Sequence, residues 1–378
     1  MKTKFFLFVA AFLLAGGGAP AYAVSIDTPA THAFLVDVNT GTMLLGKSAD
    51  EHMPTSSMSK TMTLYMVFDA LKQGQLKLTD ELPVSEKAWK MQGSKMFIKV
   101  GSKVKVEDLI RGVAIQSGND ATVALAEGLA GTEEAFVERM NIRAKELGMA
   151  NSHFMDASGW PAPEHYSTPR DLALLAQRLI TDFPEYYHYF SEKEFTYNKI
   201  HQQNRDPLLG KVEGADGIKT GHTDIAGYGL IGSALRNGRR LILVVNGLAD
   251  EKARKEEGAK LLEWGFRNFE NKQILKAGDE VEKARIWLGK EDEVPLVAEK
   301  DLTVVLPVGS RSDIKMTVSY TGPAEAPIKK GALLAKLNVT IPDQPPVSVD
   351  LLAKDDVERK WLPGRIADRF HYLVSGTY

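Results

Sequence analysis

Three short motifs stand in order along this chain of 378 residues and constrain its fold more than any other feature. They are Ser-Met-Ser-Lys at 57–60, Ser-Gly-Asn at 117–119 and Lys-Thr-Gly at 219–221. The first offers a hydroxyl beside an amine, the second a hydroxyl beside an amide, and the third a cation beside a glycine. These groups can act together only in a fold that brings three distant segments to one place.

The first motif predicts a nucleophile with its own base. Ser57 and Lys60 lie in the first turn of a predicted helix that runs to about Lys72, and residues i and i+3 share a helix face. A serine hydroxyl needs an adjacent base, and a lysine serves only if burial or a neighbouring cation lowers its pKa. We hypothesise that Lys219 is that cation. The spacing alone is weak, because it recurs at 102–105.

The second motif lies between two predicted helices, 106–115 and 119–130. In isolation, a polar triplet at such a place is a loop and a helix cap. In the company of the first motif, we expect Ser117 to pass a proton between Lys60 and a leaving amine. Asn119 would then hold the lysine and an amide of the substrate.

The third motif lies on a predicted strand within the β-rich region 212–248. We expect Gly221 to let an extended substrate approach the strand edge and pair with it as an added strand. Lys219 and Thr220 can bind a terminal carboxylate. For His222 we expect the backbone N–H to matter more than the ring.

Composition and the N-terminus exclude several classes of protein. The chain has no cysteine, which removes disulfides, thiol catalysis and cysteine-ligated metals, and its net charge of −2 gives no reason to expect nucleic-acid binding. It has no metal-binding histidine spacing and no Gly-x-Ser-x-Gly elbow, so no metal or cofactor is expected. Residues 1–23 contain two lysines, an apolar stretch of about 11 residues and Ala-Tyr-Ala, typical of a secretory signal peptide.

The remaining chain predicts three parts. Residues 24–270 mix helices with a hairpin at 33–46 and a second hairpin around Asn-Gly at 237–238. Short alternating segments over 271–356 predict an all-β domain without a chemical motif. Residues 357–378 form a basic, aromatic tail.

The tail predicts an amphipathic helix. Ile366, Phe370 and Leu373 recur at helical spacing, with Arg365 and Arg369 opposite them. Such a helix is typical of peripheral attachment in a membrane interface. The alternative is a short helix docked on the β domain.

Four segments resemble the low-molecular-mass penicillin-binding proteins, and among them the serine-type D-alanyl-D-alanine carboxypeptidases. They are Pro-Thr-Ser-Ser-Met-Ser-Lys at 54–60, Gln-Ser-Gly-Asn-Asp at 116–120, Tyr-Ser-Thr-Pro-Arg-Asp at 166–171 and Asp-Gly-Ile-Lys-Thr-Gly-His-Thr at 216–223. The resemblance implies an α/β (α+β) fold of the β-lactamase/transpeptidase type. Its five-stranded antiparallel sheet would be flanked by helices and an all-helical lobe, and followed by a small all-β domain and the terminal helix.

The resemblance also implies roles for individual residues. The catalytic residues would be Ser57, Lys60 and Ser117, and the substrate-binding residues Asn119, Lys219, Thr220, Gly221, His222 and Arg254. The backbone N–H groups of Ser57 and His222 would form the oxyanion hole. For Arg254, a solvated helix face remains the alternative, because its neighbours are charged.

The implied function is removal of the terminal D-alanine from peptidoglycan pentapeptide stems through a Ser57 acyl-enzyme, in cell-wall remodelling and cell shape. The protein would be periplasmic, attached peripherally to the inner membrane, and β-lactams would be covalent inhibitors. Three alternatives stay open: a β-lactamase using Glu164, an endopeptidase on crosslinks, and a non-enzymatic stem-binding module. At 156–160 this chain has Asp-Ala-Ser-Gly-Trp where the family more often has Asn-Ala-Thr-Gly-Leu, and we hypothesise that Trp160 alters deacylation.

Overall fold

The computed structural model describes residues 11–12, 25–309, 314–342 and 344–375. The predicted signal peptide, residues 1–23, lies outside the described residues except for β1 (Ala11–Phe12). The chain divides into two compact units. The first covers Ser25–Asn268, and the second covers Phe269–Tyr378 and includes β1. Each unit is described by itself below.

The first unit contains the predicted five-stranded antiparallel sheet, in the order β3-β2-β10-β9-β8. The strands are β2 (His32–Asp37), β3 (Thr42–Lys47), β8 (Ala215–Thr223), β9 (Gly227–Arg236) and β10 (Arg239–Leu248). Side chains alternate between two cores, as the period of a strand requires. Phe34 and Val36 enter one core, whereas Ala33 and Leu35 enter the other.

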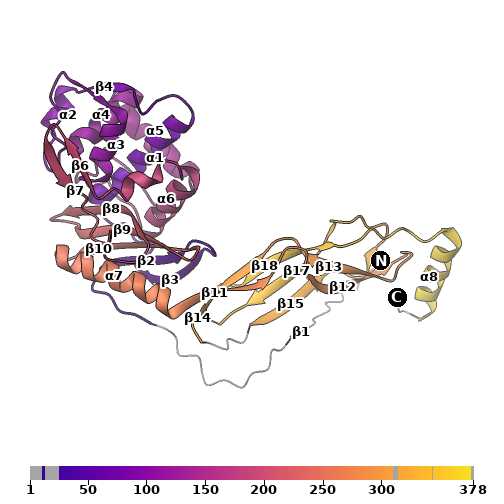
Figure 1. The fold of residues 1–378 in the computed structure, drawn as a ribbon. Helices are drawn as coiled ribbons and strands as arrows, with labels where there is room; N and C mark the ends of the chain where they lie inside the picture. The colour runs from indigo at the N-terminus through magenta and orange to yellow at the C-terminus, as the bar shows by residue number, and fades with distance from the viewer. Residues whose placement is uncertain (1–10, 13–24, 310–313, 343, 376–378) are drawn as a thin grey trace. The chain divides into compact units, whose positions relative to one another are not determined.

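Helices cover both faces of this sheet (Figure 1). Helix α7 (Glu251–Asn268) packs on one face, where Leu261 and Leu262 join the core that contains Leu35. On the other face lie α6 (Pro169–Asp182) and α1 (Lys60–Lys72). Helix α1 is buried on nearly every side, so its sequence is not strongly amphipathic.

A helical lobe surrounds α1 at the edge of the sheet formed by β8. It consists of α2 (Glu86–Lys90), α3 (Val106–Ala114), α4 (Asn119–Ala130) and α5 (Glu133–Glu146). Its remaining elements are the 3₁₀ turns η1 (Ser56–Ser59) and η2 (Tyr187–Phe190) and the pairs β4 (Glu81–Pro83) with β5 (Lys103–Lys105) and β6 (Glu194–Tyr197) with β7 (Ile200–Gln203). The predicted lobe is therefore confirmed.

The second unit contains the predicted β domain and a terminal helix. One pair joins β11 (Phe269–Leu275) to β14 (Leu302–Pro307), and a larger sheet runs β1, β15 (Lys315–Tyr320), β17 (Leu333–Thr340), β18 (Val347–Ala353), β13 (Glu293–Ala298), β12 (Glu280–Trp287) and β16 (Ala324–Glu325). Helix α8 (Leu362–Ser375) buries none of its described residues. Among the helices described, none is both long enough and apolar enough to cross a bilayer.

Candidate active site

The Ser57 hydroxyl and the Lys60 amine meet where η1 runs into α1. Lys60 Nζ lies 2.8 Å from Ser57 Oγ and 2.6 Å from the carbonyl oxygen of Ser158. The expected helix begins with a 3₁₀ turn over Ser56–Ser59. In such a turn, the side chains of residues i and i+3 eclipse each other more closely than on an α-helix. This geometry brings the amine onto the hydroxyl.

Burial is the main cause of the lowered pKa of the Lys60 amine. The side chain is 0% exposed, and burial lowers the pKa of Lys60 to about 7. The Asp156 and Asp120 carboxylates oppose this lowering of the pKa, and Arg205 adds to it. We hypothesised that the Lys219 cation lowers the pKa of Lys60, but the cation that contributes is Arg205. The pKa of Lys219 itself lies well below the ordinary value because of burial and the positive charges around it, Lys60 first.

The two polar residues of the second motif differ in their placement. Ser117 lines the site, whereas the side-chain amide of Asn119 forms its hydrogen bond elsewhere. Ser117 has a left-handed backbone, with φ of 64°, and its Oγ is buried without a hydrogen-bond partner among the described residues. Asn119 Nδ2 donates to the Gln92 carbonyl at 2.6 Å. The Asn119 backbone N–H donates to the Ser94 carbonyl at 2.7 Å. Both groups of Asn119 thus hold the loop at residues 92–94, and the described side-chain hydrogen bond is not the expected one to Lys60.

The third motif packs directly against the nucleophile turn. Lys219 is almost wholly buried, and its Nζ donates to the Thr220 carbonyl at 3.0 Å. A Cβ added to Gly221 would lie 2.9 Å from the Thr55 carbonyl oxygen and 3.1 Å from Met58 Cγ. Gly221 was expected to make room for substrate. In the structure, the space beside its Cα is filled by the turn that carries Ser57.

A cleft of about 1080 Å³ opens over these elements. Ser57, Ser117, Thr220, Gly221, His222 and Arg254 all line it. An adjoining cavity of about 390 Å³ is lined by Ser57, Asn119 and the loop at 158–161. The structure therefore gathers the predicted residues around one serine. Lys60 is buried beside the Ser57 hydroxyl, and Lys219 is buried on β8, the strand that packs against the turn carrying Ser57.

Arg254 belongs to the cleft, and the alternative of a solvated helix face is wrong at this position. Its residue exposure is 6%, and its guanidinium carbon lies 5.4 Å from the centre of the Tyr228 ring. Its Nε is buried without a hydrogen-bond partner among the residues described. An unpaired buried donor facing a cleft can bind an anionic ligand.

Three groups at the site were missed in the sequence. Arg205 lines the cleft, with Nη1 2.5 Å from Ser94 Oγ, and no local motif marks it. The Asp120 carboxylate accepts hydrogen bonds from the backbone of residues 96–98, and its place directly after the second motif was the available signal. The Ser158 carbonyl is a backbone group, so no residue type could reveal it.

Fold and site together define an enzyme that uses an activated serine for acyl transfer. Residues 19–249 match the family described as D-alanyl-D-alanine carboxypeptidase, and residues 269–359 match the C-terminal domain of penicillin-binding protein 5. The chain belongs to the serine-type D-alanyl-D-alanine carboxypeptidase family, as its motifs predicted, and acts as such a carboxypeptidase.

Similar proteins cover most of the chain. The D-alanyl-D-alanine carboxypeptidase DacA of Haemophilus influenzae is 39% identical over 350 residues, 91% of this chain and 89% of that protein. DacC of Escherichia coli is 40% identical over 94% of this chain and 92% of its own. The crystal structure of penicillin-binding protein 5 from Haemophilus influenzae has a TM-score of 0.79 at 38% identity, covering 91% of this chain and all (100%) of the other.

We predict that Gly221→Ala slows catalysis by displacing the nucleophile turn. The added methyl group would meet the Thr55 carbonyl at 2.9 Å. Overpacking costs about 1–3 kcal/mol, which corresponds to roughly five- to 150-fold in kcat/KM if the whole cost falls on the transition state. The measurement is D-alanine release from a peptide that ends in D-Ala-D-Ala. Gly364→Ala is the control, because its methyl group meets nothing closer than 3.6 Å. Equal rates for both variants would contradict the prediction.

Proposed function

We propose that Ser57 attacks the carbonyl carbon of the peptide bond between the last two D-alanines of a peptidoglycan pentapeptide stem. The observation that carries this proposal is the 2.8 Å contact between Ser57 Oγ and a fully buried Lys60 amine. The neutral amine takes the hydroxyl proton as the C–O bond forms. The C–N bond then breaks, terminal D-alanine leaves, and water hydrolyses the acyl-enzyme.

Ser117 is the group we assign to the leaving amine. Its hydroxyl is buried in the site and has no described hydrogen-bond partner, so it is free to receive a proton from Lys60 and pass one on. Developing charge on the carbonyl oxygen would be met by the backbone N–H groups of Ser57 and His222. Both residues line the cleft, and Ser57 lies in the turn that opens α1.

The terminal carboxylate of the substrate would bind at the positive end of the cleft. Lys219, Arg254 and Arg205 gather there, and burial lowers the pKa of each. Repulsion by neighbouring cations lowers the pKa of Lys219 and Arg254 further. An incoming carboxylate relieves this repulsion and favours the charged form of Lys219. Thr220 adds a hydroxyl at the same strand edge.

β-Lactams are expected to acylate Ser57 as mimics of the D-Ala-D-Ala end. Penicillin-binding protein D2 of Listeria monocytogenes was crystallised with ampicillin bound, and it has a TM-score of 0.59 at 33% identity over 64% of this chain and 99% of its own. The same ring-opening attack on this chain would leave ampicillin covalently attached to Ser57.

Release of D-alanine from a pentapeptide stem tests the proposed nucleophile. Ser57→Ala should lower the rate by about 10⁴-fold or more, because the acyl-enzyme cannot form. Ser102→Ala is the matched control, since it alters the second copy of the Ser-x-x-Lys spacing outside the cleft. Release at the parental rate by Ser57→Ala would refute the assignment.

The pH profile tests the base. With a Lys60 pKa of about 7, the amine is protonated below neutral pH and cannot accept the serine proton. We expect kcat/KM to fall about tenfold for each pH unit below 7 and to level off above it. A flat profile between pH 5 and 8 would exclude Lys60 as the base.

We further propose that the protein is exported and that α8 holds it on the periplasmic face of the inner membrane. Its apolar residues are exposed, among them Ile366 at 60%, Phe370 at 67% and Leu373 at 80%. Arg365 and Arg369 lie on the same helix and suit an anionic lipid surface. One such helix predicts reversible attachment.

Removal of residues 358–378 should abolish sedimentation with anionic lipid vesicles and leave D-alanine release unchanged. Apolar area is the main source of binding, so Phe370→Asp in the full chain should weaken sedimentation as well. Vesicle binding that survives the deletion would show that another segment attaches the protein.

A further inference from the structure

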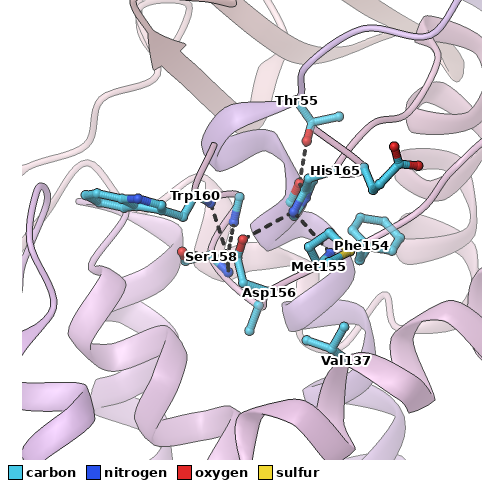
Figure 2. A network of polar contacts seen from close by, with 12 residues as sticks. Thr55, Val137, Phe154, Met155, Asp156, Ser158, Trp160 and His165 are labelled. Atoms are coloured by element: carbon cyan, nitrogen blue, oxygen red, sulfur yellow. Dashed lines mark hydrogen bonds and ion pairs between the residues drawn. The ribbon is translucent and has the colours of Figure 1, made fainter. Parts of the chain in front are cut away.

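A buried polar network lies under the nucleophile turn (Figure 2). Ser59 Oγ lies 2.6 Å from Thr55 Oγ1 and 2.7 Å from His165 Nε2. On the other side of the ring, His165 Nδ1 lies 3.2 Å from Asp156 Oδ2. The network thus joins η1 to the loop at residues 156–160.

Asp156 organises that loop with a single oxygen. Its Oδ1 accepts hydrogen bonds from Ser158 N at 2.7 Å, Ser158 Oγ at 2.8 Å, Gly159 N at 2.8 Å and Trp160 N at 3.1 Å (Figure 2). Burial alone would raise the pKa of Asp156, but the hydrogen bonds and the contact with His165 lower it to about 2. The carboxylate is therefore an anion at neutral pH.

The same loop touches both catalytic partners. The Ser158 carbonyl oxygen lies 2.6 Å from Lys60 Nζ. A Cβ on Gly159 would lie 1.8 Å from the Ser56 carbonyl oxygen, so the loop backbone packs directly on the turn that carries Ser57. A shift of the loop would therefore move the acceptor of the Lys60 amine.

The contacts run from Ser59 to His165 and from His165 to Asp156, as in a Ser-His-Asp triad. These residues nevertheless do not form a second catalytic site. Ser59 is 0% exposed, and its hydroxyl is shared between Thr55 and His165. Ser59 does not line either cavity around Ser57 among the residues described. A hydroxyl that substrate cannot reach serves to hold neighbouring groups.

We propose that Asp156 is a positioning residue for Lys60: with His165 behind it, its carboxylate holds the Ser158 carbonyl against the amine and places a negative charge in the same loop. The inference rests on the proposed role of Lys60 as the base. The other charged groups that act on Lys60 are Asp120 and Arg205. The remaining buried cation, Lys219, is itself acted on by Lys60, which lowers the pKa of Lys219. Of the charges acting on Lys60, Asp156 has the largest effect, and that effect favours the ammonium form.

Asp156→Asn separates charge from geometry. The amide keeps an oxygen for the four donors of the loop and removes the negative charge. Loss of that charge makes the Lys60 ammonium less stable, so the acid limb of the acylation rate should move to lower pH, by roughly one unit. Asp156→Ala removes the acceptor too, so its rate should fall about tenfold or more at every pH, because the Ser158 carbonyl is no longer held.

The assay follows covalent labelling of the full-length enzyme by ampicillin between pH 5 and 9. The rate is expressed per serine that finally reacts, so any unfolded fraction does not enter the result. Asp171→Asn is the matched control: this buried carboxylate anchors Asn151 N at 2.9 Å and Ser152 Oγ at 2.7 Å but lines neither cavity around Ser57. Its acid limb should coincide with that of the parent.

Two results separate the possible failures. An Asp156→Asn limb that coincides with the parental one, or moves to higher pH, overturns the role of Asp156 while leaving Lys60 as the base. A parental enzyme with no acid limb at all overturns the proposed base itself. A thermal melt of each variant shows whether Asp156→Ala is slow because it is unfolded. If Asp156→Ala is unfolded, the comparison of Asp156→Asn with the parental enzyme decides the question.

Discussion

The burial of one amine is the constraint on which the rest of this site depends. An ammonium group taken out of water must lose its proton or find compensating partners. Lys60 does both in part: its pKa falls to about 7, and its Nζ has the Ser57 hydroxyl and the Ser158 carbonyl as partners. Everything that packs around α1, from the sheet to the helical lobe, contributes to excluding water from this group.

Close backbone packing is the second requirement, because the nucleophile turn is held from two sides without intervening side chains. Gly221 of β8 and Gly159 of the neighbouring loop both approach the backbone of residues 55–56. A side chain at either position would separate strand, loop and turn. The glycine of the third motif is therefore explained first by the fold of the free enzyme, and only then by what substrate requires.

Much of this arrangement could be predicted from the sequence, since it depends on residue types at fixed spacings. The five-stranded sheet, the helical lobe and the β domain followed from periodicity, turn residues and the family resemblance. Interactions of the backbone could not be predicted in this way. The 3₁₀ turn at Ser57, the carbonyl of Ser158 and the donation from Asn119 to Gln92 depend on how distant segments meet. Arg205 and His165 escaped notice because no local pattern distinguishes them from ordinary surface or core residues.

The two buried lysines have opposite tasks in the proposed reaction, and their surroundings differ accordingly. Lys60 must be neutral to accept a proton, and its Nζ faces a hydroxyl and a carbonyl. Lys219 must be charged to bind a carboxylate, yet Lys60, Arg205 and Arg254 all disfavour its charge in the free enzyme. Asp206 offers limited compensation, because burial raises its own pKa to about 6 and its Oδ2 has no hydrogen-bond partner among the described residues. Binding of a ligand that carries a carboxylate would therefore complete the charge balance of the site. A peptide with a blocked C-terminus could not do this, which gives a physical reason for selecting a free terminal D-alanine.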